Sequence, residues 1–275
     1  MTFLARALTT VAALPAVVLL VRFGGWPMHA VGLVLALVGQ KELYRAFAVP
    51  RLLQGIGYFF AVAYLAAVFA LDRVVWEALV LYALVGAVAA VAGYGRLSLT
   101  DIVNSVFGFV YVPFMLAFVA LARGLASGHV FVWVIFIACF ACDICAYLVG
   151  SAWGRRKLSK SPSPSKTVEG LVGGLAGAAV FGFLLFFFGS RLPFFGASES
   201  LAPAQSLLLA LLSLACAGFA VIGDLFGSAI KRQAGIKDFG SFFPGHGGAL
   251  DRLDSILLAA PFLYMAAYLF EMAGG

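Results

Sequence analysis

The stretch from Ser228 to Ser255 reads SAIKRQAGIKDFGSFFPGHGGALDRLDS and separates two long apolar runs. Only 11% of the chain is charged, yet this stretch gathers both signs of charge in Lys231, Arg232, Lys237, Asp238, His246, Asp251, Arg252 and Asp254. Charged groups at the edge of a bilayer either face water or perform chemistry. The glycines at 245, 247 and 248 let a backbone approach a ligand closely. Cations, clustered carboxylates and glycines together indicate a site for phosphate and metal.

The apolar runs on either side belong to a strongly hydrophobic chain. Of its 275 residues, 64% are apolar, and its mean hydropathy is +1.07, whereas soluble domains are about 45–50% apolar. A membrane-spanning helix needs about 20 mostly apolar residues. We therefore predict an all-α polytopic integral membrane protein with about nine transmembrane helices, at residues 5–22, 27–44, 52–71, 74–94, 102–122, 129–150, 170–189, 204–223 and 253–272.

Basic residues favour one orientation of these spans. With nine spans, fourteen of the 18 Lys and Arg residues lie on the side of the N-terminus. Cytoplasmic loops carry such an excess, which predicts an N-in, C-out protein whose loops 151–169 and 224–252 face the cytoplasm. We expect a multi-pass protein of the cell inner membrane, with residues 5–22 retained as a span rather than cleaved as a signal peptide. Without a soluble basic domain, nucleic acid is not an expected partner.

Ionisable residues divide the chain unevenly. Residues 1–128 are predicted to be plain transmembrane helices, in which Glu42, Tyr44 and Arg45 are interpreted as interface anchors. Residues 129–275 form the predicted catalytic transmembrane region, and the two parts are expected to make one membrane domain. Cys139, Cys142 and Cys145 lie within one span and are interpreted as small apolar residues rather than metal ligands.

Asp143 lies inside the span 129–150, where a carboxylate is costly and is a functional candidate. Tyr147 lies one helical turn later on the same face. In the basic loop that follows, Ser165 is predicted to cap a helix beginning near Thr167, and Lys166 beside that helix start favours an anion site. The alternative is an ordinary solvated loop with an ordinary cap.

Carboxylates are predicted to gather from two further helices. If the helix after residue 204 continues, Asp224, Ser228 and Lys231 share one stripe. Asp251 and Asp254 share a face at the start of the last span. Such oxygen ligands suit Mg²⁺ or another hard divalent cation, bound together with substrate phosphates. Asp224 is expected at a helix C-terminus, where a carboxylate is disfavoured unless a cation is present.

Two features leave alternatives open. His246, the one histidine in the charged loop, is open to three interpretations: a base, a phosphate ligand or a loop-packing residue. Gly223-x-x-x-Gly227 and the glycines of 170–177 fit either a homodimer interface or packing between helices of one chain.

The charged loop also resembles the signature of the phosphatidate cytidylyltransferases, or CDP-diacylglycerol synthases. The matching positions are Ser228-x-Ile230-Lys231-Arg232-x-x-x-x-Lys237-Asp238-x-Gly240-x-x-Phe243-Pro244-x-His246-Gly247-Gly248-x-x-Asp251-Arg252-Leu253-Asp254. Two upstream segments are similar to that family's other motifs, namely Asp143-x-x-Ala146-Tyr147-x-x-Gly150 and Ser163-Pro164-Ser165-Lys166-Thr167-x-Glu169-Gly170.

The resemblance implies the reaction of CTP with phosphatidate in the membrane to give CDP-diacylglycerol and pyrophosphate. Because two polyanions must meet, positioning and charge neutralisation should dominate. Under this hypothesis Asp224 and Asp251 hold the divalent metal and Asp254 supports them. Asp143 is either a further metal ligand or a carboxylate that supports a metal ligand. The phosphates are neutralised by Lys166, Lys231, Arg232, Lys237 and Arg252. Substrate contacts are expected from Ser165, Thr167, Tyr147, Ser228 and the Gly247–Gly248 backbone, with Asp238 and His246 in the catalytic group.

Two other functions remain compatible with the residues. One is a related CTP-dependent transferase that acts on another membrane lipid, such as an isoprenoid. The other is an anion transporter that uses Asp143 and the glycine-rich helices, although transporters usually show repeated halves and a site at the membrane midplane.

Overall fold

The computed structural model describes residues 17–158, 161–189, 202–243, 245 and 247–272. Across these ranges the elements are helices, and no strand is present. Residues 17–23 are helical; the helices that follow are α2 (Gly25–Ala46), α3 (Arg51–Leu71), α4 (Trp76–Ala92), α5 (Leu99–Phe109), the π-helix η1 (Val110–Phe114), α6 (Met115–Gly124), α7 (Gly128–Trp153), α8 (Val168–Phe188), α9 (Pro203–Gln233) and α10 (Leu250–Met272).

Six segments are long and apolar enough to cross a membrane: α3, the continuous run Leu99–Gly124, α7, α8, α9 and α10. The helix α4 is apolar but shorter. Large apolar side chains, among them Val88, Val172 and Leu211, are exposed around these helices, as a lipid-facing surface requires. Over the described residues the chain is thus an all-helical polytopic membrane protein; the count of nine spans stays a prediction, and most of the predicted span 5–22 lies outside those residues.

The run Leu99–Gly124 changes its winding in the middle. Pro113 lies inside η1 and has no backbone N–H to continue the α-helical ladder. The chain passes this point through one π-helical turn, and the residues Tyr111 to Phe114 are all buried. The span predicted at 102–122 is therefore one continuous run with a locally widened turn.

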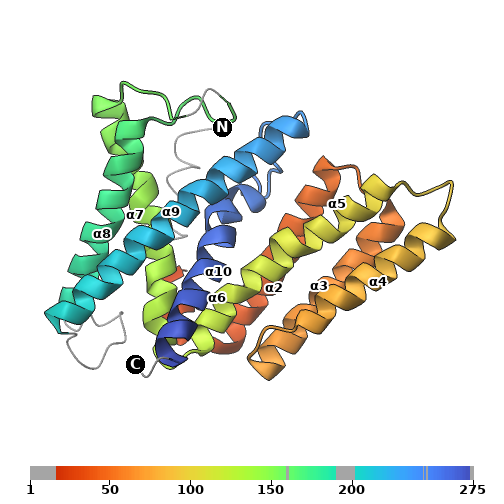
Figure 1. Ribbon diagram of the computed structural model, residues 1–275, viewed down its shortest axis with the longest axis horizontal. Coiled ribbons are helices and arrows are strands. Elements are labelled where there is room, and N and C mark those ends of the chain that lie inside the picture. Colours follow the sequence, from red (N-terminus) through yellow and green to blue (C-terminus); the bar gives the residue numbers. More distant parts are fainter. Residues whose placement is uncertain (1–16, 159–160, 190–201, 244, 246, 273–275) are drawn as a thin grey trace.

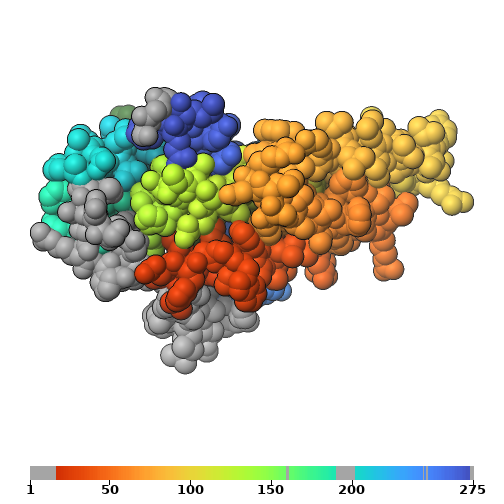
Figure 2. Space-filling model, turned by 90° about the horizontal axis from the view of Figure 1, so that it is seen from below, coloured from red at the N-terminus to blue at the C-terminus, as the bar shows by residue number. Residues whose placement is uncertain are grey.

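The helices form two groups (Figure 1). One group is α2 to α6 with η1, and the other is α7 to α10. Helices α7, α8, α9 and α10 pack against one another, and α10 also contacts α2 and α6. Figure 2 shows α3 and α4, in orange and yellow, extending to one side of this block. The larger of two apolar clusters includes buried residues of both groups, such as Tyr64 and Leu257. The connections α7–α8 and α9–α10 lie at the same end of the bundle (Figure 1).

Glycines account for the close packing of α7 on α8. A Cβ atom added at Gly170 would lie 2.8 Å from the carbonyl oxygen of Ala146, and one at Gly174 would lie 2.8 Å from that of Cys142. Glycine permits this approach because it has no side chain. These glycines therefore serve packing within one chain, and the Cys142 and Cys145 side chains lie in the same interface.

Helix α9 is longer than the predicted span 204–223. It continues to Gln233, and 31 residues at 1.5 Å rise give about 46 Å. Because the hydrocarbon core of a bilayer is about 30 Å thick, the helix is longer than a perpendicular span needs. Asp224 therefore lies within the helix rather than at its C-terminus, and the predicted conflict with the helix dipole does not arise. The last turn instead carries Lys231 and Arg232, where the dipole favours positive charge.

Candidate active site

One cavity of about 250 Å³ is lined almost entirely by charged side chains. Its walls come from α7, α9, α10 and the segment between α9 and α10, and its lining residues are Asp143, Asp224, Lys231, Asp238, Asp251, Arg252, Asp254 and Ser255. All of these except Ser255 were predicted from the sequence as site residues. The fold thus brings together carboxylates and cations that lie more than a hundred residues apart in the sequence.

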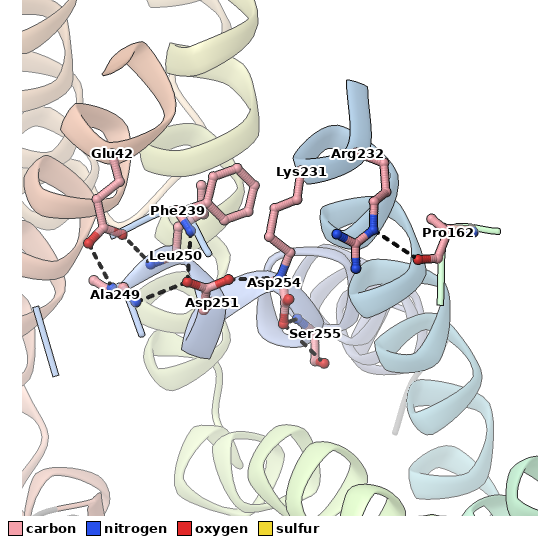
Figure 3. A network of polar contacts seen from close by, with 11 residues as sticks. Glu42, Pro162, Lys231, Arg232, Phe239, Ala249, Leu250, Asp251, Asp254 and Ser255 are labelled. Atoms are coloured by element: carbon pink, nitrogen blue, oxygen red, sulfur yellow. Dashed lines mark hydrogen bonds and ion pairs between the residues drawn. The ribbon is translucent and has the colours of Figure 1, made fainter. Parts of the chain in front are cut away.

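Asp251 joins three segments of this wall (Figure 3). Its Oδ1 atom accepts from Lys231 Nζ at 2.7 Å, and its Oδ2 atom accepts from the backbone N–H groups of Phe239 and Gly248, each at 2.9 Å. Its side chain is only 6% exposed. The carboxylate therefore ties the end of α9 and the connecting loop to the start of α10. The Gly248 N–H, predicted to donate to a phosphate, donates instead to Asp251.

Asp254 lies in a notch of α9. A Cβ atom at Gly223 would lie 2.4 Å from the Asp254 carbonyl oxygen, and one at Gly227 would lie 3.1 Å from its Oδ2 atom. The carboxylate accepts from the Ser255 N–H at 2.8 Å, and Asp254 is 6% exposed. The motif Gly223-x-x-x-Gly227 therefore packs α9 on α10 within one chain, which supports the intramolecular alternative for these glycines.

Asp224 forms an ion pair with Lys166, whose side chain reaches it from the α7–α8 connection. The two side chains are 29% and 25% exposed, so the pair is accessible from the cavity mouth. Lys166 is held by local structure, since its carbonyl oxygen accepts from the Leu158 N–H at 2.9 Å. This lysine thus brings the α7–α8 connection to the carboxylates of the cavity.

The start of α8 differs from the prediction in one detail. Thr167, not Ser165, is the N-cap residue, and its hydroxyl oxygen accepts from the Gly170 N–H at 3.1 Å. Glu169 lies in the first turn of α8. Its carboxylate accepts from the N–H groups of Arg155 and Arg156, which closes the connection onto the helix. Ser165 is exposed. It does not cap the helix, because the helix begins at Val168, two residues later than a cap at 165 requires.

Several predicted site residues are not among those that line the cavity. Tyr147 is 74% exposed, and Lys237 is also exposed. Arg232 is exposed and its Nε atom lies 3.5 Å from the Pro162 carbonyl oxygen, which places it beside the α7–α8 connection. Ser228 and Gly247 are partly buried. His246 lies outside the described residues.

Glu42 is the residue that the sequence interpretation missed. It was interpreted as a residue that anchors a helix at the membrane interface. In the structure it is 5% exposed and lies against the start of α10. Its Oε1 atom accepts from the Ala249 N–H at 3.1 Å and its Oε2 atom from the Leu250 N–H at 2.9 Å (Figure 3). The available signal was Lys41-Glu42 interrupting an apolar run, since a charge at such a place needs a partner.

The donor set suits a hard cation shared with a substrate. Among the residues that the structure describes, no group of three or more His, Cys, Asp or Glu side chains stands ready to hold a metal. The predicted three-carboxylate set of Asp224, Asp251 and Asp254 is not preformed, because Asp251 is directed to Lys231 and the loop. Mg²⁺ commonly binds through one or two carboxylates and completes its shell with phosphates and water. Asp224 and Asp254 fit that smaller requirement.

Comparison with known proteins gives one consistent result. The chain is similar to proteins named phosphatidate cytidylyltransferase from Haemophilus influenzae, with 40% identity over 129 residues (46% of this chain, 42% of the relative), and from Bacillus subtilis, with 41% identity over 140 residues (50% and 48%). It is 33% identical to the Aquifex aeolicus protein of that name over 184 residues (67% and 64%).

The chain spans about half the length of the first two of these curated relatives. A family comparison reaches much further along it: the profile of the cytidylyltransferase family matches residues 4–270. That span contains every helix except the end of α10, together with all the residues that line the cavity. On this match, the chain belongs to the cytidylyltransferase family.

Proposed function

We propose that this protein is a phosphatidate cytidylyltransferase that forms CDP-diacylglycerol and pyrophosphate from CTP and phosphatidate. The observation that carries the proposal is the cavity at the end of the bundle, where carboxylates and basic side chains meet beside apolar helices. A polar nucleotide and a lipid headgroup can meet at such a boundary. Membership of the family and the names of the relatives support the same reaction.

The proposed reaction needs no covalent intermediate on the protein. A phosphate oxygen of phosphatidate attacks the α-phosphorus of CTP, and a new P–O–P bond forms. The bond from the α-phosphorus to the bridging oxygen breaks, and its electron pair leaves with pyrophosphate. Because the lipid phosphate is largely ionised near neutral pH, no strong base is required. The barrier lies in bringing two polyanions together, so charge neutralisation and alignment supply most of the catalysis.

The basic residues around the cavity are assigned to that neutralisation. Lys231 and Arg252 line the cavity, and Lys166 reaches it through Asp224. We assign Arg232 and Lys237 to the phosphates at the outer edge, because both are exposed and each is the neighbour in sequence of a residue that lines the cavity. The remaining proposed substrate contacts are Ser165, Thr167, Ser228, Tyr147, His246 and the Gly247 backbone.

Asp224 and Asp254 would hold a divalent cation, with Mg²⁺ as the first choice, and Asp143 and Asp251 would support it from the cavity wall. When bound, such an ion would neutralise phosphate charge during the transfer. Lys166 would then pair with a phosphate rather than with Asp224. Asp238 would act at the loop side of the cavity, which it lines.

The proposal places the cavity on the cytoplasmic side of the inner membrane, with the N-terminus on the same side. The excess of Lys and Arg at this end of the spans supports that orientation. CTP is then available from the cytoplasm, and phosphatidate reaches the site from the inner leaflet.

The test is pyrophosphate release by the purified protein in detergent with CTP, phosphatidate and Mg²⁺. Release should require all three components, stop with EDTA and fall by at least about a hundredfold in Asp224→Asn. Glu77→Gln is the matched control, because its carboxylate is exposed and pairs only with Arg73 among the described contacts. Release supported by a polyprenyl phosphate but not by phosphatidate would move the acceptor to another lipid. Normal release from Asp224→Asn would overturn the metal assignment.

A further inference from the structure

We propose that Glu42 is a positioning residue that holds the start of α10, and with it the wall of the catalytic cavity, in the working arrangement. The catalytic part of this inference rests on the proposed function, whereas its structural part does not. Glu42 does not line the cavity, so its effect has to pass through the backbone it binds. Its contacts join the N-terminal helices to the charged loop about 200 residues later in the chain.

The first observation is the pattern of backbone hydrogen bonds. Three consecutive N–H groups at the start of α10 are taken by carboxylates: Gly248 by Asp251, and Ala249 and Leu250 by Glu42. Ala249 and Leu250 are completely buried, so without Glu42 two N–H groups would lack a partner away from water. Leaving such groups unsatisfied is costly. The start of α10 would therefore shift or lose helical structure. Asp251, the residue after Leu250, would move with it.

The second observation is a glycine cradle around the same carboxylate. A Cβ atom at Gly240 would lie 2.1 Å from Glu42 Oε1, and one at Gly248 would lie 2.4 Å from Oε2. At both positions the three nearest atoms all belong to Glu42. Neither glycine has a positive φ angle, so backbone conformation does not demand glycine there. The loop lacks side chains at these two places because the Glu42 carboxylate occupies the space.

The third observation is that α2 presents Glu42 from a fixed position. Two residues later, the hydroxyl group of Tyr44 donates to the Ser105 carbonyl oxygen at 2.9 Å and accepts from Gln40 Nε2 at 2.8 Å. Tyr44 and Gln40 are completely buried. This network locks α2 onto α5, so the carboxylate cannot easily follow the loop if the loop moves. The N-terminal helices thus act as a rigid support for the cavity wall.

The experiment combines pyrophosphate release with amide hydrogen exchange, measured by mass spectrometry on peptides that cover 239–250. In Glu42→Gln we expect kcat to fall about 10- to 100-fold, because small displacements of catalytic groups have effects of that size. The KM for CTP should change by no more than about threefold, since Glu42 does not line the cavity. Exchange at 249 and 250 should accelerate. Lys41→Gln, an exposed neighbour on α2, is the control and should leave both readouts unchanged.

A second variant keeps the inference testable if Glu42→Gln does not fold. Gly240→Ala should displace the Glu42 carboxylate and give the same exchange pattern, and its effect should be smaller in the Glu42→Ala background than in the wild type. Gly218→Ala, whose Cβ would meet nothing within 4 Å, is the control. Wild-type exchange at 249 and 250 in both Glu42→Gln and Gly240→Ala would overturn the inference. If the wild type released no pyrophosphate, the proposed function would fail, while the exchange result would still decide the role of Glu42.

Discussion

Lys231 Nζ lies 2.7 Å from Asp251 Oδ1 and joins the last turn of α9 to the first turn of α10. The side chains are 13% and 6% exposed, so little water screens the pair. The same aspartate accepts from two backbone N–H groups of the intervening loop. One carboxylate therefore organises the whole α9–α10 turn, and the cavity wall depends on it.

Asp251→Asn should destabilise the protein strongly. The change leaves the Lys231 charge without its partner in a mostly buried place, which costs about 3 kcal/mol. Thermal unfolding in detergent should show a clear fall in the melting temperature. Arg73→Ala removes an ion pair whose side chains are 56% and 67% exposed, and should cost less than about 1 kcal/mol. Equal effects of the two changes would contradict the structural role of Asp251.

Gly223→Ala should separate α9 from α10. A Cβ atom at 223 would meet the carbonyl oxygen of Asp254 at 2.4 Å, and a backbone atom cannot move aside as a side-chain end can. We expect a lower melting temperature and reduced pyrophosphate release, since Asp254 is one partner of this contact and Asp224 follows the other. Gly218→Ala, on the same helix with open space around it, should instead be neutral or stabilise by up to about 1 kcal/mol. An unchanged Gly223→Ala would refute the close packing.

The N-cap of α8 gives a prediction that separates Thr167 from Ser165. Thr167→Ala removes the hydroxyl oxygen that accepts from the Gly170 N–H and should cost about 1 kcal/mol. Ser165→Ala should leave stability unchanged, because Ser165 is exposed and lies outside the helix. Melting curves of the two variants decide the matter, and a larger loss in Ser165→Ala would show that the cap lies there instead.

Lys166→Met should nearly abolish pyrophosphate release. The lysine already lies beside Asp224 at the cavity mouth, and the proposed mechanism needs its charge on a phosphate. A loss of at least about a hundredfold in kcat/KM is expected. Lys157→Met provides the control, because Lys157 is in the same connection and its side chain is exposed; its activity should stay within about threefold. Similar losses in both variants would indicate a general effect of loop charge.

Much of the site could be predicted from local patterns. A carboxylate within an apolar run is costly wherever the chain folds, so Asp143 and Asp224 were identifiable without a structure. Helical periodicity placed Asp224 and Lys231 on one stripe, and the continuous helix α9 confirms it. The predicted span 204–223 was shorter than α9. Hydropathy shows where the apolar residues end, whereas the backbone hydrogen bonds of the helix continue into the polar residues that follow.

By itself, the sequence determined the class of the protein, the positions of its apolar helices and most of the residues around the cavity, because burial cost and periodicity act along the chain. Only the tertiary structure decided which charged and polar groups form ion pairs and hydrogen bonds with each other. It paired Lys166 with Asp224 and directed Asp251 to the loop rather than to a preformed metal group. It also brought Glu42 to Ala249 and Leu250. Hydrogen bonds across about 200 residues leave no local periodicity, so Glu42 resembled an interface anchor until α2 was packed against α10.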